Sequence, residues 1–167
     1  MVSLKQLKKG EWTVLLFTAG YVLAFLAYYI AIRNYEFLWY VGVLVFFFVL
    51  ILLTLHRSRF DYVILAGLSL WGLLHMAGGG IVVKGQVLYA LVLVPLWEID
   101  GSAVLKYDQL VHFFGFGITT LVAYHLLLPY LGGRVNWQVV FPILVAAGMG
   151  MGALNEIVEF MAVAAFP

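Results

Sequence analysis

Residues 106–128 read KYDQLVHFFGFGITTLVAYHLLL, and residues 138–165 read QVVFPILVAAGMGMGALNEIVEFMAVAA. Each stretch is long and apolar enough to cross a bilayer as a helix, which takes about 20 residues. Each also carries histidine or acidic side chains, which are costly in hydrocarbon and mark functional sites when they occur there. The two stretches therefore predict a membrane protein with a polar site on its last two helices.

Helical spacing places the ionisable residues of each stretch on one face. Asp108 and His112 are four positions apart, which is about 40° around a helix that turns about 100° per residue. Glu156 and Glu159 are three positions apart, about 60° around the axis, with Asn155 beside them. Both helices are thus expected to present acidic groups to a common neighbour.

Composition supports a membrane class and excludes others. Hydrophobic residues make up 65% and charged residues 10% of the 167 positions, against about 25% charged in soluble domains. The formal net charge of +1 gives no basic excess for nucleic acid. Because the chain has no cysteine, a metal site would have to use histidine and carboxylate ligands. The first apolar stretch is too long for a signal-peptide core and is interpreted as a retained span.

The apolar stretches predict an all-α polytopic bundle of about five transmembrane helices in one domain, residues 1–167. Residues 81–97 are interrupted by Lys84, Gly85 and Pro95, and their apolar core is too short to span. We therefore expect a short re-entrant or interfacial segment there. The expected spans are 12–32, 37–55, 62–77, 106–128 and 138–165.

Lysine and arginine are distributed unevenly between alternate connections, and the cytoplasmic side of a membrane protein carries the excess. With the N-terminus in the cytoplasm, six of the nine Lys and Arg residues lie inside and three outside, and the C-terminus is extracytoplasmic. Three separate stretches then deliver ionisable side chains to one depth, the outer half of the bilayer. These residues are His75, Asp108, His112, Glu156 and Glu159.

Small residues extend both polar faces along the helices. Gly148 and Gly152 form a small-x-x-x-small pattern that leads to the glutamates of the last span. Gly115 and Thr119 extend the polar face of the span before it. Such faces let two backbones approach closely, so the acids are expected to meet across the bundle. The three phenylalanines between 113 and 116 are expected mostly to face lipid.

The clustered ionisable groups suit a divalent cation, because carboxylates in a low dielectric must otherwise be protonated or paired. His75, Asp108 and His112 are candidate ligands together with the two glutamates, Glu156 and Glu159. One glutamate is the candidate general base while the other is a ligand, and the spacing does not choose between them. Zinc, iron or manganese match this set of nitrogen and oxygen donors.

Two other hypotheses stay open. In the first, the residues form a purely structural buried network: Asp108 pairs with His112, one glutamate is protonated, and Asn155 and Lys106 complete it. In the second, the acids exchange protons or cations in a transporter, which requires polar residues that continue towards the inner face. Both polar faces turn apolar in that direction apart from His125, which favours a site open to one side.

Other polar residues have simpler interpretations. His125 lies about 220° around the helix from His112 and is assigned to the inner interface. His56 lies among arginines and is expected in a solvated loop. The Gly78–Gly80 run is expected to end the third span, with phosphate binding by its amides as the weaker alternative. Tyr89 is expected in the interfacial aromatic belt.

The stretch from Lys106 to Phe116, followed by Asn155-Glu-Ile-Val-Glu159, resembles the YjdF family of multi-pass inner-membrane proteins. Its Asp-x-x-x-His-Phe and Glu-x-x-Glu motifs are more distantly similar to VanZ-like proteins, named for an association with teicoplanin resistance. The resemblance covers about residues 62–165 and implies a plasma (inner) membrane location. In that location the metal hypothesis becomes a hydrolase or transferase acting on a lipid or lipid-linked envelope substrate. The residues that the resemblance marks are His75, Asp108, His112, Glu156 and Glu159.

The chain differs from these relatives in two places. VanZ-like proteins usually carry a basic residue after the aspartate, where this chain has Gln109. The family continues past the glutamates into another span, whereas this sequence stops at Pro167. The open side of the cluster is then expected to be covered by a homodimer packed through the last span, using Gly148 and Gly152, or by the rest of a longer parent chain. Membrane lipids are the other expected partners.

Overall fold

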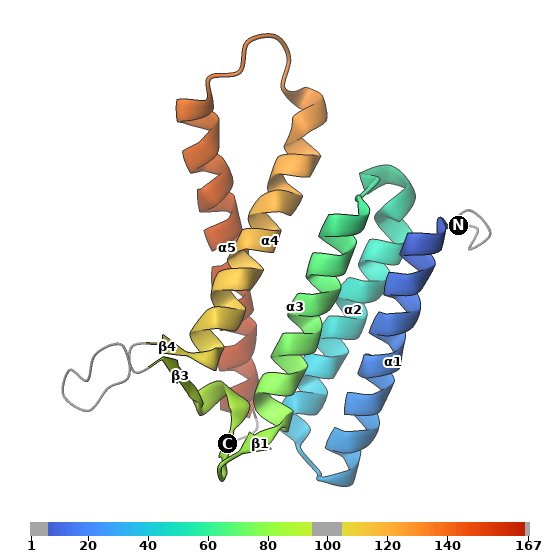
Figure 1. The fold of residues 1–167 in the computed structure, drawn as a ribbon, viewed down its shortest axis with the longest axis vertical. Coiled ribbons are helices and arrows are strands. Elements are labelled where there is room, and N and C mark those ends of the chain that lie inside the picture. Colours follow the sequence, from blue (N-terminus) through green and yellow to red (C-terminus); the bar gives the residue numbers. More distant parts are fainter. Residues whose placement is uncertain (1–6, 95–104, 166–167) are drawn as a thin grey trace, which may run out of the picture.

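The computed structural model describes residues 7–94 and 105–165, and these form five long helices that run antiparallel in sequence order (Figure 1). All five are long and apolar enough to cross a membrane by length and composition. The predicted all-α polytopic bundle is confirmed, and each helix overlaps one predicted span. The helices are α1 (Lys9–Ala31), α2 (Tyr35–Ser58), α3 (Tyr62–Gly80), α4 (Tyr107–Leu127) and α5 (Trp137–Ala165).

Polar residues in two short turns set where α2 and α3 begin. The Asn34 side chain accepts a hydrogen bond from the Phe37 amide at 3.0 Å, and Asp61 accepts one from the Ile64 amide at 2.9 Å. These caps pair amides that have no partner within the helix. The turns fold α1, α2 and α3 back on one another.

Residues 81–94 follow α3 at one end of the bundle, which we call the hairpin end. There β1 (Val82–Val83) pairs antiparallel with β2 (Gln86–Val87). The turn residues Lys84 and Gly85 both have positive φ, 52° and 82°, as a two-residue hairpin turn favours. Lys84 and Gly85, which interrupt the apolar pattern of the sequence, are thus the residues that reverse the chain.

A 3₁₀ turn, η2 (Leu88–Ala90), leads from the hairpin into β3 (Val92–Val94), which pairs antiparallel with β4 (Leu105–Lys106) just before α4. The described part of the predicted 81–97 segment therefore consists of strands and one short turn. Residues 95–97 of that segment lie outside the described residues. Its interfacial or re-entrant placement in a membrane stays a prediction.

The glycine run at the end of α3 does not stop the helix at residue 77, as predicted, but forms its last turn. Each glycine lies beneath an aromatic ring, and a Cβ atom at any of the three would collide with that ring. Packing against three rings offsets the helical cost of glycine, which is about 1 kcal/mol per residue. The pairs are Gly78 with Tyr89, Gly79 with Phe37, and Gly80 with Tyr29.

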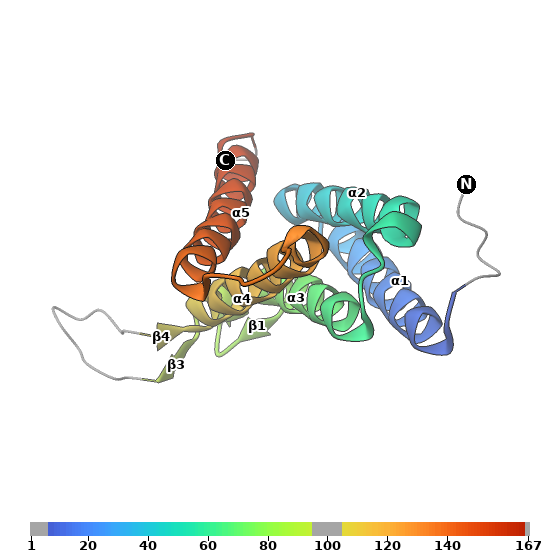
Figure 2. The same cartoon turned by 90° about the horizontal axis from the view of Figure 1, so that it is seen from above.

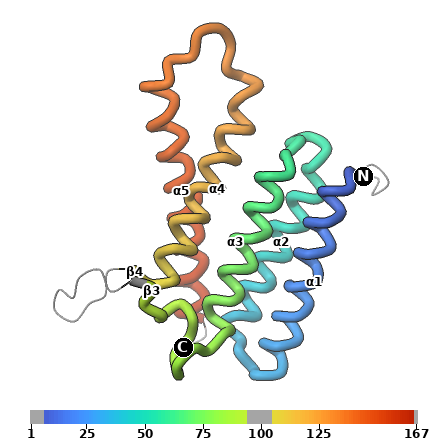
Figure 3. Tube along the Cα trace, in the orientation of Figure 1, coloured from blue at the N-terminus to red at the C-terminus, as the bar shows by residue number. Residues whose placement is uncertain are grey.

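In the bundle, α3 lies between α1 and α2 on one side and α4 on the other (Figure 2). α5 packs along α4 and also contacts α2. The α4–α5 pair extends past the other helices at the end opposite the hairpin, as the Cα trace shows (Figure 3). The described chain begins near that opposite end and finishes at the hairpin end (Figure 1).

Five tyrosine hydroxyls donate hydrogen bonds to backbone carbonyls of α3. They come from α1, η2 and α4, so three elements are tied to one central helix. Tyrosines predicted only for an interfacial belt, such as Tyr89, thus also hold the bundle together. The pairs are Tyr21 with Ser69 (2.9 Å), Tyr28 with Gly80 (3.0 Å), Tyr29 with Met76, Tyr89 with His75 (3.0 Å) and Tyr107 with Leu74 (3.1 Å).

The small residues of α5 pack against α4 within the same chain. Thr120 covers Gly148, and the ring of Phe116 covers Gly152. Phe116 therefore lies in the helix interface and not towards lipid as expected, whereas Phe113 is 77% exposed. Gly148 and Gly152 therefore face α4 within the chain. The expected homodimer through the last span stays a prediction.

The small face of α4 is divided between two neighbours. Gly115 packs against Trp71 of α3, so it does not serve the approach to α5 as predicted. Thr119 does contact α5, because its Oγ1 lies 3.4 Å from the Gly148 carbonyl oxygen. α4 is therefore held closely on both sides.

His125 lies near the opposite end, where its Nε2 donates to the Ser58 carbonyl at 2.9 Å and its ring contacts Phe60 at a centroid distance of 5.5 Å. Ser58 is the last residue of α2, where carbonyls lack a partner within the helix. His125 thus joins α4 to the end of α2. His56 is exposed, as expected, but it lies in the last turn of α2 and not in a loop.

Candidate metal centre

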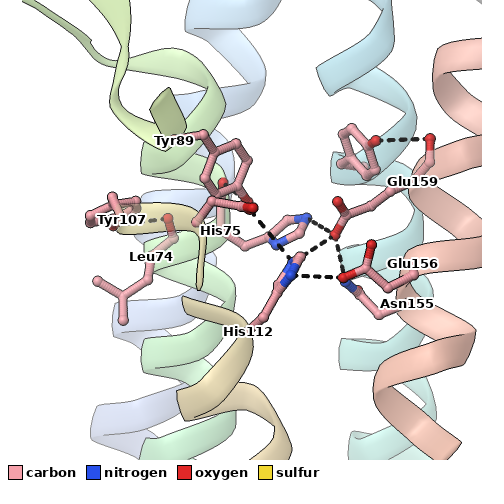
Figure 4. A network of polar contacts seen from close by, with 10 residues as sticks. Leu74, His75, Tyr89, Tyr107, His112, Asn155, Glu156 and Glu159 are labelled. Atoms are coloured by element: carbon pink, nitrogen blue, oxygen red, sulfur yellow. Dashed lines mark hydrogen bonds and ion pairs between the residues drawn. The ribbon is translucent and has the colours of Figure 1, made fainter. Parts of the chain in front are cut away.

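Three helices bring the predicted residues together at the hairpin end (Figure 4). His75 lies near the end of α3, His112 is in the second turn of α4, and Glu156 and Glu159 lie in the last turns of α5. The prediction that separate spans deliver these side chains to one level is confirmed by their contacts.

Glu159 is the centre of the cluster. Its Oε1 lies 3.1 Å from Nε2 of His112 and 3.6 Å from Nε2 of His75. The same oxygen accepts a hydrogen bond of 2.5 Å from Nδ2 of Asn155, one turn earlier on α5. The hydroxyl of Tyr40 donates to the Glu159 main-chain carbonyl at 3.2 Å, which ties this turn of α5 to α2.

His75, His112 and Glu159 each offer one donor atom, and these atoms all lie within 4.8 Å of one another. Zinc bonds of about 2.0–2.1 Å in tetrahedral geometry place neighbouring donors about 3.3 Å apart. The contacts of the Glu159 oxygen, 3.1 and 3.6 Å, lie on either side of that value. Two imidazoles and one carboxylate are also a donor set typical of catalytic zinc and of non-haem iron.

The other nitrogen of His112 faces a second carboxylate. Nδ1 lies 2.8 Å from Oε1 of Glu156, whose side chain is 54% exposed. A neutral imidazole has one N–H, so a proton donated from Nδ1 to Glu156 leaves a lone pair on Nε2 towards Glu159. Glu156 thus contacts His112 on the side away from the other donors, the place of the groups that orient metal-binding histidines.

Asp108 lies at the edge of the cluster. Its Oδ1 is 3.9 Å from Nε2 of His112, too far for a hydrogen bond, and its side chain is 40% exposed. Neither Asp108 nor Glu156 belongs to the group of three donors that could share one ion. Of the five predicted residues, the structure therefore brings three into ligand spacing and places two beside them.

His75 is the most enclosed member of the cluster, with 8% of its surface exposed. Its ring lies between those of Tyr40 and Tyr89, at centroid distances of 5.5 and 5.6 Å. Within the described part of the chain, Nδ1 has no hydrogen-bond partner, and the only polar contact of Nε2 is the 3.6 Å approach to Glu159. A buried imidazole without a short hydrogen bond costs about 1–3 kcal/mol, which an additional ligand would offset.

The family model described as predicted membrane protein (DUF2238) matches residues 13–167. The chain belongs to this family. Its five apolar helices agree with that description and with a multi-pass membrane location. No curated protein and no solved structure matches the chain. The DUF2238 match establishes a family of membrane proteins, and the resemblance to YjdF-like and VanZ-like proteins stays a prediction.

In this DUF2238 member, several residues of the site were not found from the sequence. Tyr40 and Glu36, in the first turns of α2, line a cavity of about 470 Å³ together with Tyr89, Glu156 and Glu159. Burial raises the pKa of the Tyr89 phenol, so this residue stays a donor to the His75 carbonyl. Their roles depend on how α2 and the hairpin pack on α5, and no helical periodicity indicates that.

Proposed function

We propose that this protein binds one divalent transition metal ion through His75, His112 and Glu159, and that the site hydrolyses or transfers a group of a lipid or lipid-linked envelope substrate. The observation that carries the proposal is the spacing of the three donor atoms, which matches that of ligands around one ion. Zinc, iron and manganese all accept two imidazoles and a carboxylate.

A bound divalent ion supplies Lewis acidity to a carbonyl or phosphoryl oxygen. The protein's own residues then have distinct tasks. Glu156 fixes the orientation and proton of His112 through Nδ1. Asp108 lies on the Nε2 side of the same ring and is half-exposed, so it is the carboxylate placed to accept a proton from an attacking water. This assigns Glu159 as ligand, Glu156 as an orienting group and Asp108 as base.

The predicted orientation in the membrane supports a substrate at the outer surface. The cluster lies at the hairpin end, and the Lys and Arg count supports an extracytoplasmic position for that end. The resemblance to YjdF-like and VanZ-like proteins supports the plasma membrane as the location. A second copy that covers the open side would use the surface of α5 that is not packed on α4.

A hydrogen-bonded network without metal is the second candidate, favoured by the short contact between Asn155 and Glu159. A transport path has less support, because His125, the one His, Asp, Glu, Lys or Arg residue of α4 beyond His112, bonds to Ser58 at the opposite end.

The deciding experiment is elemental analysis of wild-type protein purified in mild detergent without chelator. The metal proposal expects about one equivalent of zinc, iron or manganese per chain. The protein is also exposed to each ion and measured again after the excess is removed. If it then still holds less than about half an equivalent of any transition metal, the metal proposal is rejected and the hydrogen-bonded network remains.

A further inference from the structure

A cavity of about 470 Å³ adjoins the candidate metal ligands, and this volume lies within the range of about 300–1,000 Å³ typical of small-molecule sites. It is bounded by the first turns of α2, the last turns of α5 and the hairpin segment, and Glu159 forms part of its wall. A molecule held in this cavity would lie next to Glu159, the candidate ligand that lines it.

The polar lining of the cavity is acidic. Glu36, Glu156 and Glu159 contribute carboxylates, and within residues 7–94 and 105–165 no Lys, Arg or His side chain lines it. Glu156 and Glu159 are paired with His112. Among the described residues the Glu36 side chain has neither a hydrogen bond nor an ion pair, and it lies in the first turn of α2. The cavity thus has one carboxylate that lacks a partner.

Besides Phe160, three aromatic residues whose rings are clustered line the same cavity: Phe37, Tyr40 and Tyr89. The ring centroids of Phe37 and Tyr40 are 5.0 Å apart, and those of Phe37 and Tyr89 are 6.4 Å apart. Both tyrosine hydroxyls donate to main-chain carbonyls, so the rings are what these residues offer to a ligand. Clustered aromatic rings beside a carboxylate are typical of sites for ammonium groups.

The rim of the cavity is apolar and faces outward. Phe160 and Val163 of α5 line it and are 73% and 54% exposed. Because α5 is a membrane-spanning helix, these side chains contact acyl chains when the protein is in a bilayer. The cavity is therefore open towards lipid at the seam between α2 and α5.

We propose that this cavity binds an ammonium-bearing lipid, with the ammonium group at Glu36 among the three rings and the acyl chains against Phe160 and Val163. The proposal rests on the proposed function, since it names the substrate class of the metal centre. Glu36 and Glu159 line the same cavity, so the phosphodiester next to the ammonium group would lie on the side of the candidate ligand Glu159. An anionic headgroup without an ammonium group would be repelled by Glu36.

The test is native mass spectrometry of the detergent-solubilised full chain with phosphatidylethanolamine and phosphatidylglycerol of identical acyl chains. Wild-type protein should bind the ammonium-bearing lipid about tenfold more tightly, the contribution of one charge-assisted contact. Glu36→Gln should reduce this preference to about twofold or less, and Glu36→Asp should keep most of it. Glu11→Gln, which removes a charge at the opposite end and can keep the hydrogen bond from the Lys8 amide, is the matched control.

Equal binding of the two lipids by wild-type protein, or an unchanged preference in Glu36→Gln, would overturn the proposal. Binding of soluble glycerophosphoethanolamine as tight as that of the lipid would overturn the lipid assignment. Metal content is measured in the same preparations. If the protein holds metal but shows no lipid preference, only the cavity proposal is rejected. If it prefers the ammonium-bearing lipid but holds no metal, only the metal centre is rejected.

Discussion

The Nδ1 atom of His112 lies 2.8 Å from Oε1 of Glu156, across the interface between α4 and α5. This contact determines which nitrogen of the imidazole is left for other groups. If Nδ1 carries the proton, Nε2 points a lone pair at Glu159, and a cation between them relieves the repulsion. If no cation is bound, the imidazole must carry two protons or one glutamate must be protonated. The two cases respond differently to substitution.

Glu156→Ala should weaken metal binding without abolishing it. The orienting contact to His112 is lost, and loss of such a partner typically costs about 10–100-fold in metal affinity. Because Glu156 is more than half exposed, the fold should be retained. A titration with a competing chelator measures the affinity. An affinity equal to that of wild type would show that Glu156 has no part in holding His112.

Glu159→Gln and His112→Ala should each empty the site, because each removes one of the three donors. A neutral network should instead tolerate Glu159→Gln, because glutamine keeps the volume and the hydrogen bonds at a cost of about 1–3 kcal/mol or less. Elemental analysis of the purified variants distinguishes the cases. His125→Ala is the matched control and should keep full metal content, since His125 bonds to Ser58 far from the cluster.

His125→Ala should nevertheless lower stability by about 1 kcal/mol, because it removes the hydrogen bond to the Ser58 carbonyl and the contact with Phe60. His56→Ala removes an exposed histidine of α2 and should change stability by less than about 0.5 kcal/mol. Thermal unfolding in detergent compares them. Identical midpoints would mean that the contacts of His125 with Ser58 and Phe60 contribute nothing to stability.

Gly152→Ala should destabilise the α4–α5 pair by about 1–3 kcal/mol, since the new methyl group would meet the ring of Phe116. Gly150 lies on the same helix with no atom within 4 Å of a Cβ position, so Gly150→Ala should be neutral or stabilising. The two variants differ only in the face they alter. If thermal unfolding gives the same midpoint for both, the packing of α4 on α5 is not as described.

The absence of cysteine makes the orientation testable by single labelling sites. Gln86→Cys lies on the exposed β2 strand, and Tyr130→Cys lies at the opposite end, where the native side chain is 83% exposed. Neither change alters a charge. With the N-terminus in the cytoplasm, an impermeant maleimide should label Gln86→Cys in intact cells and Tyr130→Cys only after lysis. The reverse result would place the metal centre on the cytoplasmic side.

The sequence was sufficient to predict the helices and the grouping of the ionisable residues, because both follow from local rules. Hydropathy determines which stretches span, and the alternation of spans determines that His75, His112 and Glu159 share a level. The rotation of each helix about its axis does not follow from such local rules. It depends on which neighbour a small face meets, so Gly115 was assigned to the wrong partner and Phe116 to the wrong environment.

The cavity could not be predicted from the sequence for a related reason. Glu36 and Tyr40 lie in α2, whose span carries no motif, and they reach the site only because α2 contacts α5 near the hairpin end. The Gly78–Gly80 run was interpreted from glycine's low helix propensity alone. Rings from α1, α2 and η2 pack on that run, and tertiary contact of this kind outweighs propensity.

The hydroxyls that bond to α3 also bear on how the sequence of this protein can vary. Carbonyls inside a helix keep their own amide partner, so phenylalanine in place of Tyr21, Tyr29, Tyr89 or Tyr107 leaves no main-chain group unpaired. Gly80 is in the last turn, where Tyr28 supplies a partner that the helix cannot. At four of these positions we therefore expect tyrosine and phenylalanine to be exchangeable one at a time, whereas at position 28 we expect the hydroxyl to be retained.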